Sequence, residues 1–173
     1  MGDTGVSSVD YISAAFQAAA RLAAITDLRD IRLMKSHVEM VRSPATDPFL
    51  AYHLDADSAV EYEPGTESFV VRGTYRVSIT SASTADAGNN SSSKEPDSTV
   101  ARIEFEQAAL FVMEIGDDKL PNSEELNAYA ISTGQYALYP YAREYISDLT
   151  MRLGLPPLTI GVLKIPFHME KER

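Results

Sequence analysis

The chain has 173 residues, a length that predicts a single domain, residues 1–173, with an ordinary hydrophobic core. Hydrophobic residues make up 45% of the sequence and charged residues 23%, which excludes wholesale disorder. The net charge of −10 repels nucleic-acid phosphates and anionic lipid, so we expect neither nucleic-acid binding nor membrane insertion.

Residues 8–26 are predicted to form an N-terminal helix. Ser8 is suited to the N-cap position, and an alanine-rich sequence with apolar residues at helical spacing follows it. Because such an apolar stripe needs a covering partner, we expect this helix to pack on another surface of the protein.

Four segments in the middle of the chain alternate between apolar and polar residues. This pattern predicts long antiparallel strands with one buried face and one solvated face. In the first segment the alternation changes phase near Lys35, which predicts a β-bulge or a bend. A Pro-Gly turn at residues 63–66 is expected to join the second and third segments. The segments run over residues 31–40, 52–63, 69–80 and 101–115.

Two connecting segments lack this alternation. Residues 82–98, between the third and fourth strands, are rich in Ser, Asp, Asn and Gly, so we expect a flexible hairpin loop. Residues 43–49 join the first and second strands and end on Phe49, a large apolar side chain that is unusual in a plain surface loop.

The C-terminal third predicts two helices. Asn122 and Glu125 have the spacing of a capping box, and the helix that they begin is expected to end near Gly134. A longer helix is predicted from Pro140 to a stop at Gly154, which two prolines follow. The apolar residues of the longer helix form more than one stripe. We therefore expect one side to cover the sheet and the other side to meet a second partner.

The elements together predict an α+β fold, in which a long C-terminal helix packs on one face of a four-stranded antiparallel sheet and an extra N-terminal helix is added. Residues 155–163, after the long helix, are apolar yet contain two prolines and a glycine. Large apolar side chains on such irregular segments often line a binding groove. Residues 164–173 are expected to form a tail.

No catalytic, metal or cofactor site is predicted. The sequence has no cysteine, and His37, His53 and His168 lack metal-ligand spacing. Glu104 and Glu106 are interpreted as part of a solvated strand face. We therefore expect a protein that is not an enzyme and needs no cofactor. The first residues lack the basic and apolar regions of a secretory signal, which predicts a cytoplasmic protein.

The stretch from Leu138 to Ile160 resembles the main-helix signature of the SecB family of export chaperones. Residues 139–144, Tyr-Pro-Tyr-Ala-Arg-Glu, match the start of that helix, and Pro157-Leu158 match the loop behind it. The similarity runs from about residue 28 to residue 163. It is longest with the mycobacterial SecB-like chaperones of toxin–antitoxin–chaperone systems, through segments that include residues 29–33 and 148–159.

The resemblance implies a homotetramer, built as a dimer of dimers, that holds unfolded polypeptides in apolar grooves without ATP for protein export. In this family the groove lies between the loop after the first strand and the loop after the main helix. Aspartate in place of Leu158 or Ile160 is expected to weaken client binding and to leave the fold intact. By position, the expected client contacts are Phe49, Tyr52, Tyr136, Tyr139, Leu155, Leu158, Ile160 and Val162.

Two departures from the family pattern affect this expectation. SecB has a second helix after the groove loop that covers the groove and contributes to contact with the translocation motor SecA, whereas only the short tail follows here. We expect the N-terminal helix to cover the groove in its place. SecA is implied as a partner only through an acidic strand face that is similar in kind.

Two other functions remain open. The same fold could serve as a dedicated chaperone that binds and stabilises one antitoxin in a toxin–antitoxin–chaperone system. A small-molecule enzyme or ligand-binding module is the other alternative, and a compact closed pocket with converging polar groups would favour it. The sequence does not decide between a general and a dedicated chaperone.

Overall fold

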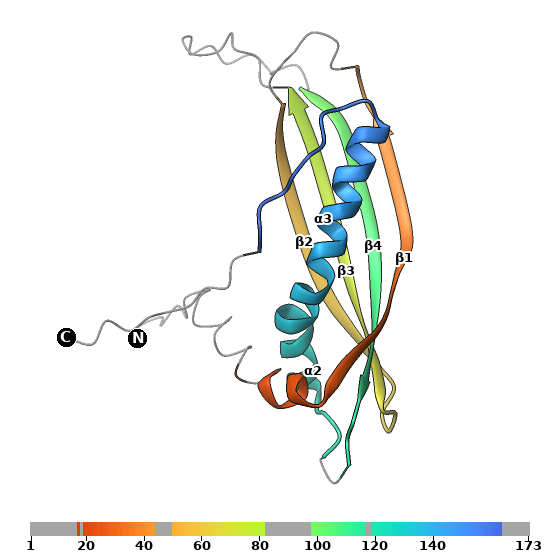
Figure 1. Cartoon of the computed structure of the whole chain (residues 1–173), viewed down its shortest axis with the longest axis vertical. Coiled ribbons are helices and arrows are strands. Elements are labelled where there is room, and N and C mark those ends of the chain that lie inside the picture. The colour runs from red at the N-terminus through yellow and green to blue at the C-terminus, as the bar shows by residue number, and fades with distance from the viewer. Residues whose placement is uncertain (1–16, 18, 44–49, 82–97, 117–118, 164–173) are drawn as a thin grey trace, which may run out of the picture.

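A four-stranded antiparallel sheet carries a long helix on one face (Figure 1). The computed structural model describes residues 17, 19–43, 50–81, 98–116 and 119–163. The strands lie in the spatial order β1-β4-β3-β2, so the second and third strands, and the third and fourth, are neighbours in a meander. The predicted α+β architecture is confirmed. The strands are β1 (Thr26–Met40), β2 (Leu50–Tyr62), β3 (Ser68–Ser81) and β4 (Thr99–Met113).

The sheet has the two unlike faces that the alternation predicts. Along β3 and β4, every second side chain is buried under the helices and the residues between them are more exposed. The register between β1 and β4 shifts twice, once between Leu28 and Asp30 and once between Leu33 and Lys35. The second shift confirms the predicted change of phase, because one extra residue turns the following side chains to the opposite face.

The helical part is continuous, and the predicted break at Gly134 is wrong. Helix α2 (Ser123–Tyr129) passes into a π-helical turn, η2 (Ala130–Gly134), and then into α3 (Gln135–Arg152). Gly134 has helical backbone angles, and a Cβ atom on it would lie 3.0 Å from both methyl carbons of Val71. Glycine at position 134 therefore allows the helix to pack closely against the sheet, and it does not end the helix. Pro140 lies inside α3 and does not begin it.

Two groups of buried side chains fill the space between the sheet and the helices. The α2 cluster includes three aromatic rings, Phe69, Phe111 and Tyr129, whose centroids are 5.1–5.4 Å apart. The α3 cluster is built around Tyr75 and Phe105, whose rings stack at 4.9 Å. Each cluster lies under the helix after which it is named.

The N-terminal helix comprises residues 17 and 19–24 in the part of the chain that the structure describes. Its buried residues Ala19 and Leu22 belong to the α2 cluster, at the lower end of the sheet in Figure 1. The loop after α3 packs on the other cluster, so residues 17 and 19–24 do not provide the expected cover of the groove. The predictions for residues 8–16, for Phe49, for the loop up to residue 97 and for the tail 164–173 fall outside the described residues.

Candidate functional site

The segment that follows α3 turns back and runs beside the helix (Figure 1). We call residues 155–163 the return segment. The turn begins at Gly154, whose φ of 74° lies in the left-handed region that favours glycine. Thr150 then makes two hydrogen bonds to the segment. Its carbonyl oxygen accepts from the Leu155 amide at 3.0 Å, and its Oγ1 accepts from the Leu158 amide at 2.9 Å.

A third contact fixes the far end of the return segment. The Tyr139 hydroxyl donates to the carbonyl oxygen of Gly161 at 2.6 Å. Between these contacts, Ile160 is fully buried in the α3 cluster. The return segment is therefore held against its own subunit, and it separates two hollows.

The larger hollow, which we call the helix hollow, lies between α3 and the end of the return segment. Its volume is about 620 Å³. Arg143, Glu144 and Asp148 supply charges of both signs, and no group of three metal-binding side chains occurs among the described residues. The lining residues are Tyr136, Tyr139, Pro140, Arg143, Glu144, Ser147, Asp148, Met151, Thr159, Val162 and Leu163.

The smaller hollow, the strand hollow, lies between the beginning of β2 and the other side of the return segment. Its volume is about 260 Å³, and the side chains that line it are apolar apart from the Tyr52 hydroxyl. Ile79 of β3 completes it on the sheet side. The lining residues are Leu50, Ala51, Tyr52, Ile79, Leu155, Pro156, Pro157 and Leu158.

The predicted contact residues divide between these hollows. Tyr136, Tyr139 and Val162 line the helix hollow, and Val162 is 68% exposed. Tyr52, Leu155 and Leu158 line the strand hollow, where Tyr52 is 43% exposed and Leu155 only 5%.

Ile160 lines neither hollow and is 0% exposed. The expectation that Ile160→Asp leaves the fold intact is therefore wrong, because the change would place an unpaired charge in the core. Leu158, the other position at which aspartate is expected to weaken client binding, is half-buried.

The tyrosines of the helix hollow remain protonated hydrogen-bond donors at neutral pH. Burial raises the pKa of Tyr139, and the nearby Tyr52 phenol raises it further, while Arg143 acts in the opposite direction. Burial also raises the pKa of Tyr136. The hydroxyl–carbonyl contact that fixes the return segment thus persists over the physiological pH range.

Sequence reasoning missed Met151 and Leu163 as lining residues of the helix hollow. Met151 is 53% exposed and lies on the outer side of α3, four residues after Ser147 and eight after Arg143. That helical spacing was a usable signal, because it marks one face of the long helix. Leu163 offered no such signal, since the return segment has no periodicity.

The interpretation of the acidic strand residues is supported by ion pairs on the open face of the sheet. Arg72 contacts Glu106 at 2.5 Å and Glu61 at 2.6 Å, and Arg76 contacts Asp57 at 3.1 Å. Glu106 is therefore engaged in a cross-strand ion pair and does not form a carboxylate pair with Glu104.

Comparison with known proteins agrees with this geometry. The family model described as preprotein translocase subunit SecB matches residues 65–168. The SecB-like chaperone Rv1957 of Mycobacterium tuberculosis is 44% identical over 150 residues, which are 85% of this chain and 82% of the relative. The chain belongs to the SecB family.

A second SecB-like chaperone, MT2006 of Mycobacterium tuberculosis, is 43% identical over the same shares of the two chains. A solved structure of Rv1957 in complex with a ChAD peptide from the Rv1956 HigA1 antitoxin superposes with a TM-score of 0.74. That comparison has 40% identity and covers 87% of this chain and 99% of the other. The prediction of a SecB-like chaperone is confirmed.

Proposed function

We propose that this SecB-like chaperone holds unfolded or partly folded polypeptide segments in the helix hollow and the strand hollow, without ATP and without catalysis. An unfolded client exposes apolar side chains, and their burial is favourable by about 25 cal/mol per Å². Because this driving force has no direction, many different segments can bind. The net charge of −10 keeps the apolar surface soluble and favours clients with basic flanks.

The observation that carries this proposal is the exposed apolar lining on both sides of the return segment. Val162 and Tyr52 stay accessible although Tyr139 and Thr150 hold the segment in place. A small-molecule enzyme needs polar groups that converge on one substrate. The hollows instead offer mainly aromatic and aliphatic side chains, to which Arg143, Glu144 and Asp148 add charges in the larger one.

We propose a dedicated antitoxin client as the alternative to a general one. The structure of the relative Rv1957 contains a peptide from an antitoxin, and this chain superposes on 99% of it. One assay distinguishes a general chaperone from a dedicated one. A general chaperone suppresses the aggregation of any chemically unfolded protein, whereas a dedicated one protects only its cognate antitoxin.

We further propose that the chain forms a homotetramer. On the helix-bearing side of the edge strand β1, Leu28 and Leu33 are 40% and 48% exposed. Beside Leu33, the side-chain oxygen of Gln107 is buried without a hydrogen-bond partner in the described part of the chain. A second copy would cover these apolar side chains and bring a donor to Gln107.

We also propose a cytoplasmic location for the protein and the translocation motor SecA as a further partner. Among the described residues, no helix is long and apolar enough to cross a membrane. The open face of the sheet carries both signs of charge in ion pairs, so a SecA contact there would have to displace internal partners. Pull-down of purified SecA at 0.1 M and at 0.5 M salt, between which the Debye length falls from about 10 Å to about 4 Å, tests the SecA contact alone.

Val162→Asp tests the proposed function with little risk to the fold, because the side chain is already 68% exposed. We expect the variant to lose most of its suppression of client aggregation while its unfolding midpoint stays unchanged. Leu120→Asp is the matched control, since Leu120 is an exposed apolar residue that lines neither hollow. Equal activity of both variants and the wild type would contradict the proposal.

A further inference from the structure

One row of side chains on α3 runs along the helix hollow. The row consists of Tyr139, Arg143, Ser147 and Met151, which all line the hollow. Residues four positions apart lie on the same face of a helix. From the first to the last member of the row, α3 rises by about 18 Å, which is the length of about five residues of extended chain. The hollow therefore offers a short extended segment a path along the helix.

Arg143 is the only cation among the described residues that line the hollow, and it is half-buried. It forms neither a hydrogen bond nor an ion pair with any residue of the described part of the chain. Asp148 is paired instead with Arg152, whose Nε donates to its carboxylate at 2.7 Å. Arg143 lies close enough to the Tyr139 phenol to lower the pKa of that group, against the effect of burial. The guanidinium donors of Arg143 are therefore available to a molecule bound in the hollow.

A bound polypeptide segment needs such donors. An extended segment has one carbonyl oxygen per residue, and a carbonyl oxygen that is buried without a donor costs free energy. Tyr139 does not meet this need, because its hydroxyl already donates to the Gly161 carbonyl oxygen at 2.6 Å. The hydroxyl groups of Ser147 and Thr159 also line the hollow, but each is a single neutral donor. Arg143 therefore offers the strongest hydrogen bonds of the lining, because its donors carry a charge.

The charges around Arg143 favour a neutral acceptor over a carboxylate. Glu144 lines the same hollow and offsets the charge of Arg143, and Arg152 balances Asp148. The net charge of the whole chain, −10, repels anions further. A peptide carbonyl has a dipole and no net charge, so it can accept from the guanidinium without this repulsion.

We propose that Arg143 is the residue through which the helix hollow binds the peptide backbone of a client. Its guanidinium donates to main-chain carbonyl oxygens of an extended segment, while the apolar lining receives the side chains. This inference rests on the proposed binding of clients in the helix hollow. It adds a polar contact that any client sequence can make, because every residue has a carbonyl group.

Arg143→Met tests the inference, because methionine keeps an apolar side chain of similar length, favours a helix and has no donor. Arg76→Met is the matched control, since Arg76 lies on the open face of the sheet, where it pairs with Asp57. The probe is a fluorescein-labelled peptide of alternating leucine and serine, with a lysine at each end and both termini blocked. Fluorescence anisotropy should show binding about ten-fold weaker in Arg143→Met than in the wild type, and unchanged binding in Arg76→Met.

The opposite sign of the effect is informative. A hollow that binds by apolar burial alone would hold the peptide equally well or more tightly after Arg143→Met, because the change replaces a charged side chain with an apolar one. Equal or tighter binding would therefore overturn the inference. The unfolding midpoints of both variants should match that of the wild type.

Two changes to the peptide identify the acceptor. An ester in place of one amide weakens the carbonyl as an acceptor, so at least one ester position should weaken binding to the wild type and not to Arg143→Met. The absence of any such position would overturn the inference. Aspartate in place of a central serine should bind no more tightly than asparagine at that position. Tighter binding of the aspartate peptide that Arg143→Met abolishes would identify a carboxylate site and would also overturn the inference.

Val162→Asp separates the role of Arg143 from the proposed function. Loss of peptide binding in Val162→Asp, together with full binding in Arg143→Met, would keep the hollow as the client site and overturn the role of Arg143. Full binding in both variants would contradict client binding in the hollow, and the inference with it. Loss of binding in both variants, each with an unchanged unfolding midpoint, is the result that we expect.

Discussion

At the scale of single residues, two side chains of α3 fix the position of the return segment between the two hollows. Thr150 bonds the beginning of the return segment and Tyr139 bonds its end, and both side chains are buried. A buried hydrogen bond contributes a net stabilisation of about 1 kcal/mol, and leaving one partner unpaired costs more. The shape of both hollows therefore depends on two hydroxyl groups.

Tyr139→Phe tests this dependence. The change keeps the ring and removes the donor to Gly161, so we expect a loss of about 1 kcal/mol in the free energy of unfolding. Hydrogen exchange at residues 161–163 should also become faster. Tyr141→Phe is the control, because Tyr141 is largely exposed. Unchanged exchange in Tyr139→Phe would mean that Ile160 and the Thr150 hydrogen bonds hold the return segment without the Tyr139 hydroxyl.

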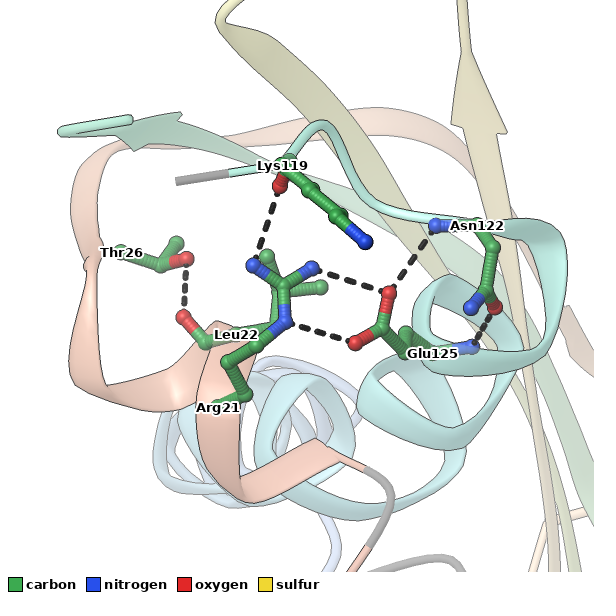
Figure 2. A network of polar contacts seen from close by, with 6 residues as sticks. All are labelled: Arg21, Leu22, Thr26, Lys119, Asn122 and Glu125. Carbon is green, nitrogen blue, oxygen red and sulfur yellow. Dashed lines mark hydrogen bonds and ion pairs between the residues drawn. The ribbon is translucent and has the colours of Figure 1, made fainter. Parts of the chain in front are cut away.

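The ion pair of Glu125 with Arg21 of the N-terminal helix predicts an acid dependence of stability (Figure 2). Hydrogen bonding to Arg21 is the first cause, and the Asn122 amide a further one, of a folded-state pKa below the usual value of 4.5. The contribution to stability is therefore fully present above the unfolded pKa, and it is lost as the pH falls from about 4.5 through the lower folded pKa.

Glu125→Gln should flatten this part of the pH profile. Glutamine retains the capping box geometry and loses the charge, so the difference from wild type is electrostatic. Urea unfolding at pH 7 and at pH 3 measures it, with the exposed neighbour Glu124→Gln as the control. A profile of Glu125→Gln as steep as that of Glu124→Gln would contradict the assignment.

At the scale of elements, the π-helical turn η2 keeps α2 and α3 in one continuous helix that stays on the sheet. Gly134 faces β3, against the methyl groups of Val71. π-Helical turns insert an additional residue and re-aim the side chains that follow. Four of the five buried residues of α3 recur every four positions, Leu138, Ala142, Ile146 and Thr150, and the fifth is Tyr139.

Gly134→Ala should destabilise the fold by about 1–3 kcal/mol, because the new Cβ would lie 3.0 Å from both Val71 methyl carbons. Gly161→Ala is the matched control, since nothing lies within 4 Å of a Cβ there. In a Val71→Ala background the cost of Gly134→Ala should fall. Additive costs in this double-mutant cycle would contradict the proposed contact.

The strands could be predicted from the sequence because alternation is a local signal, and the phase change near Lys35 even located a bulge. The capping box was equally predictable, since its two residues are three positions apart. The Arg21–Glu125 pair was not, because its partners are separated by 104 positions. In the return segment, apolar side chains without periodicity could not be sorted into the buried Ile160 and the exposed Val162.

At the scale of the whole molecule, the N-terminal helix packs on the α2 cluster, whereas the return segment that separates the two hollows packs on the α3 cluster. The edge strand β1 presents apolar side chains that remain exposed, among them Leu28 and Leu33. Monomeric proteins expose large apolar patches rarely, and such patches mark interfaces. The fold therefore combines the proposed client-binding surfaces with an edge suited to a second copy.

Leu33→Asp tests the proposed subunit contact. Placing a charge at this edge should shift the mass measured by light scattering from the tetramer toward smaller species, while circular dichroism stays the same. Leu120→Asp is a closely matched control, because both leucines are 48% exposed before the change. A tetramer of unchanged stability in Leu33→Asp would place the interface elsewhere.

The most direct test of client binding in the helix hollow uses the absence of cysteine from the chain. Val162→Cys and Leu120→Cys each introduce one thiol, the first in the hollow and the second outside it. The rate of maleimide labelling is measured with and without a saturating unfolded client. Slower labelling at position 162 alone is the predicted result. Unchanged labelling at position 162 while the client is bound would contradict the assignment of the hollow as the client-binding site.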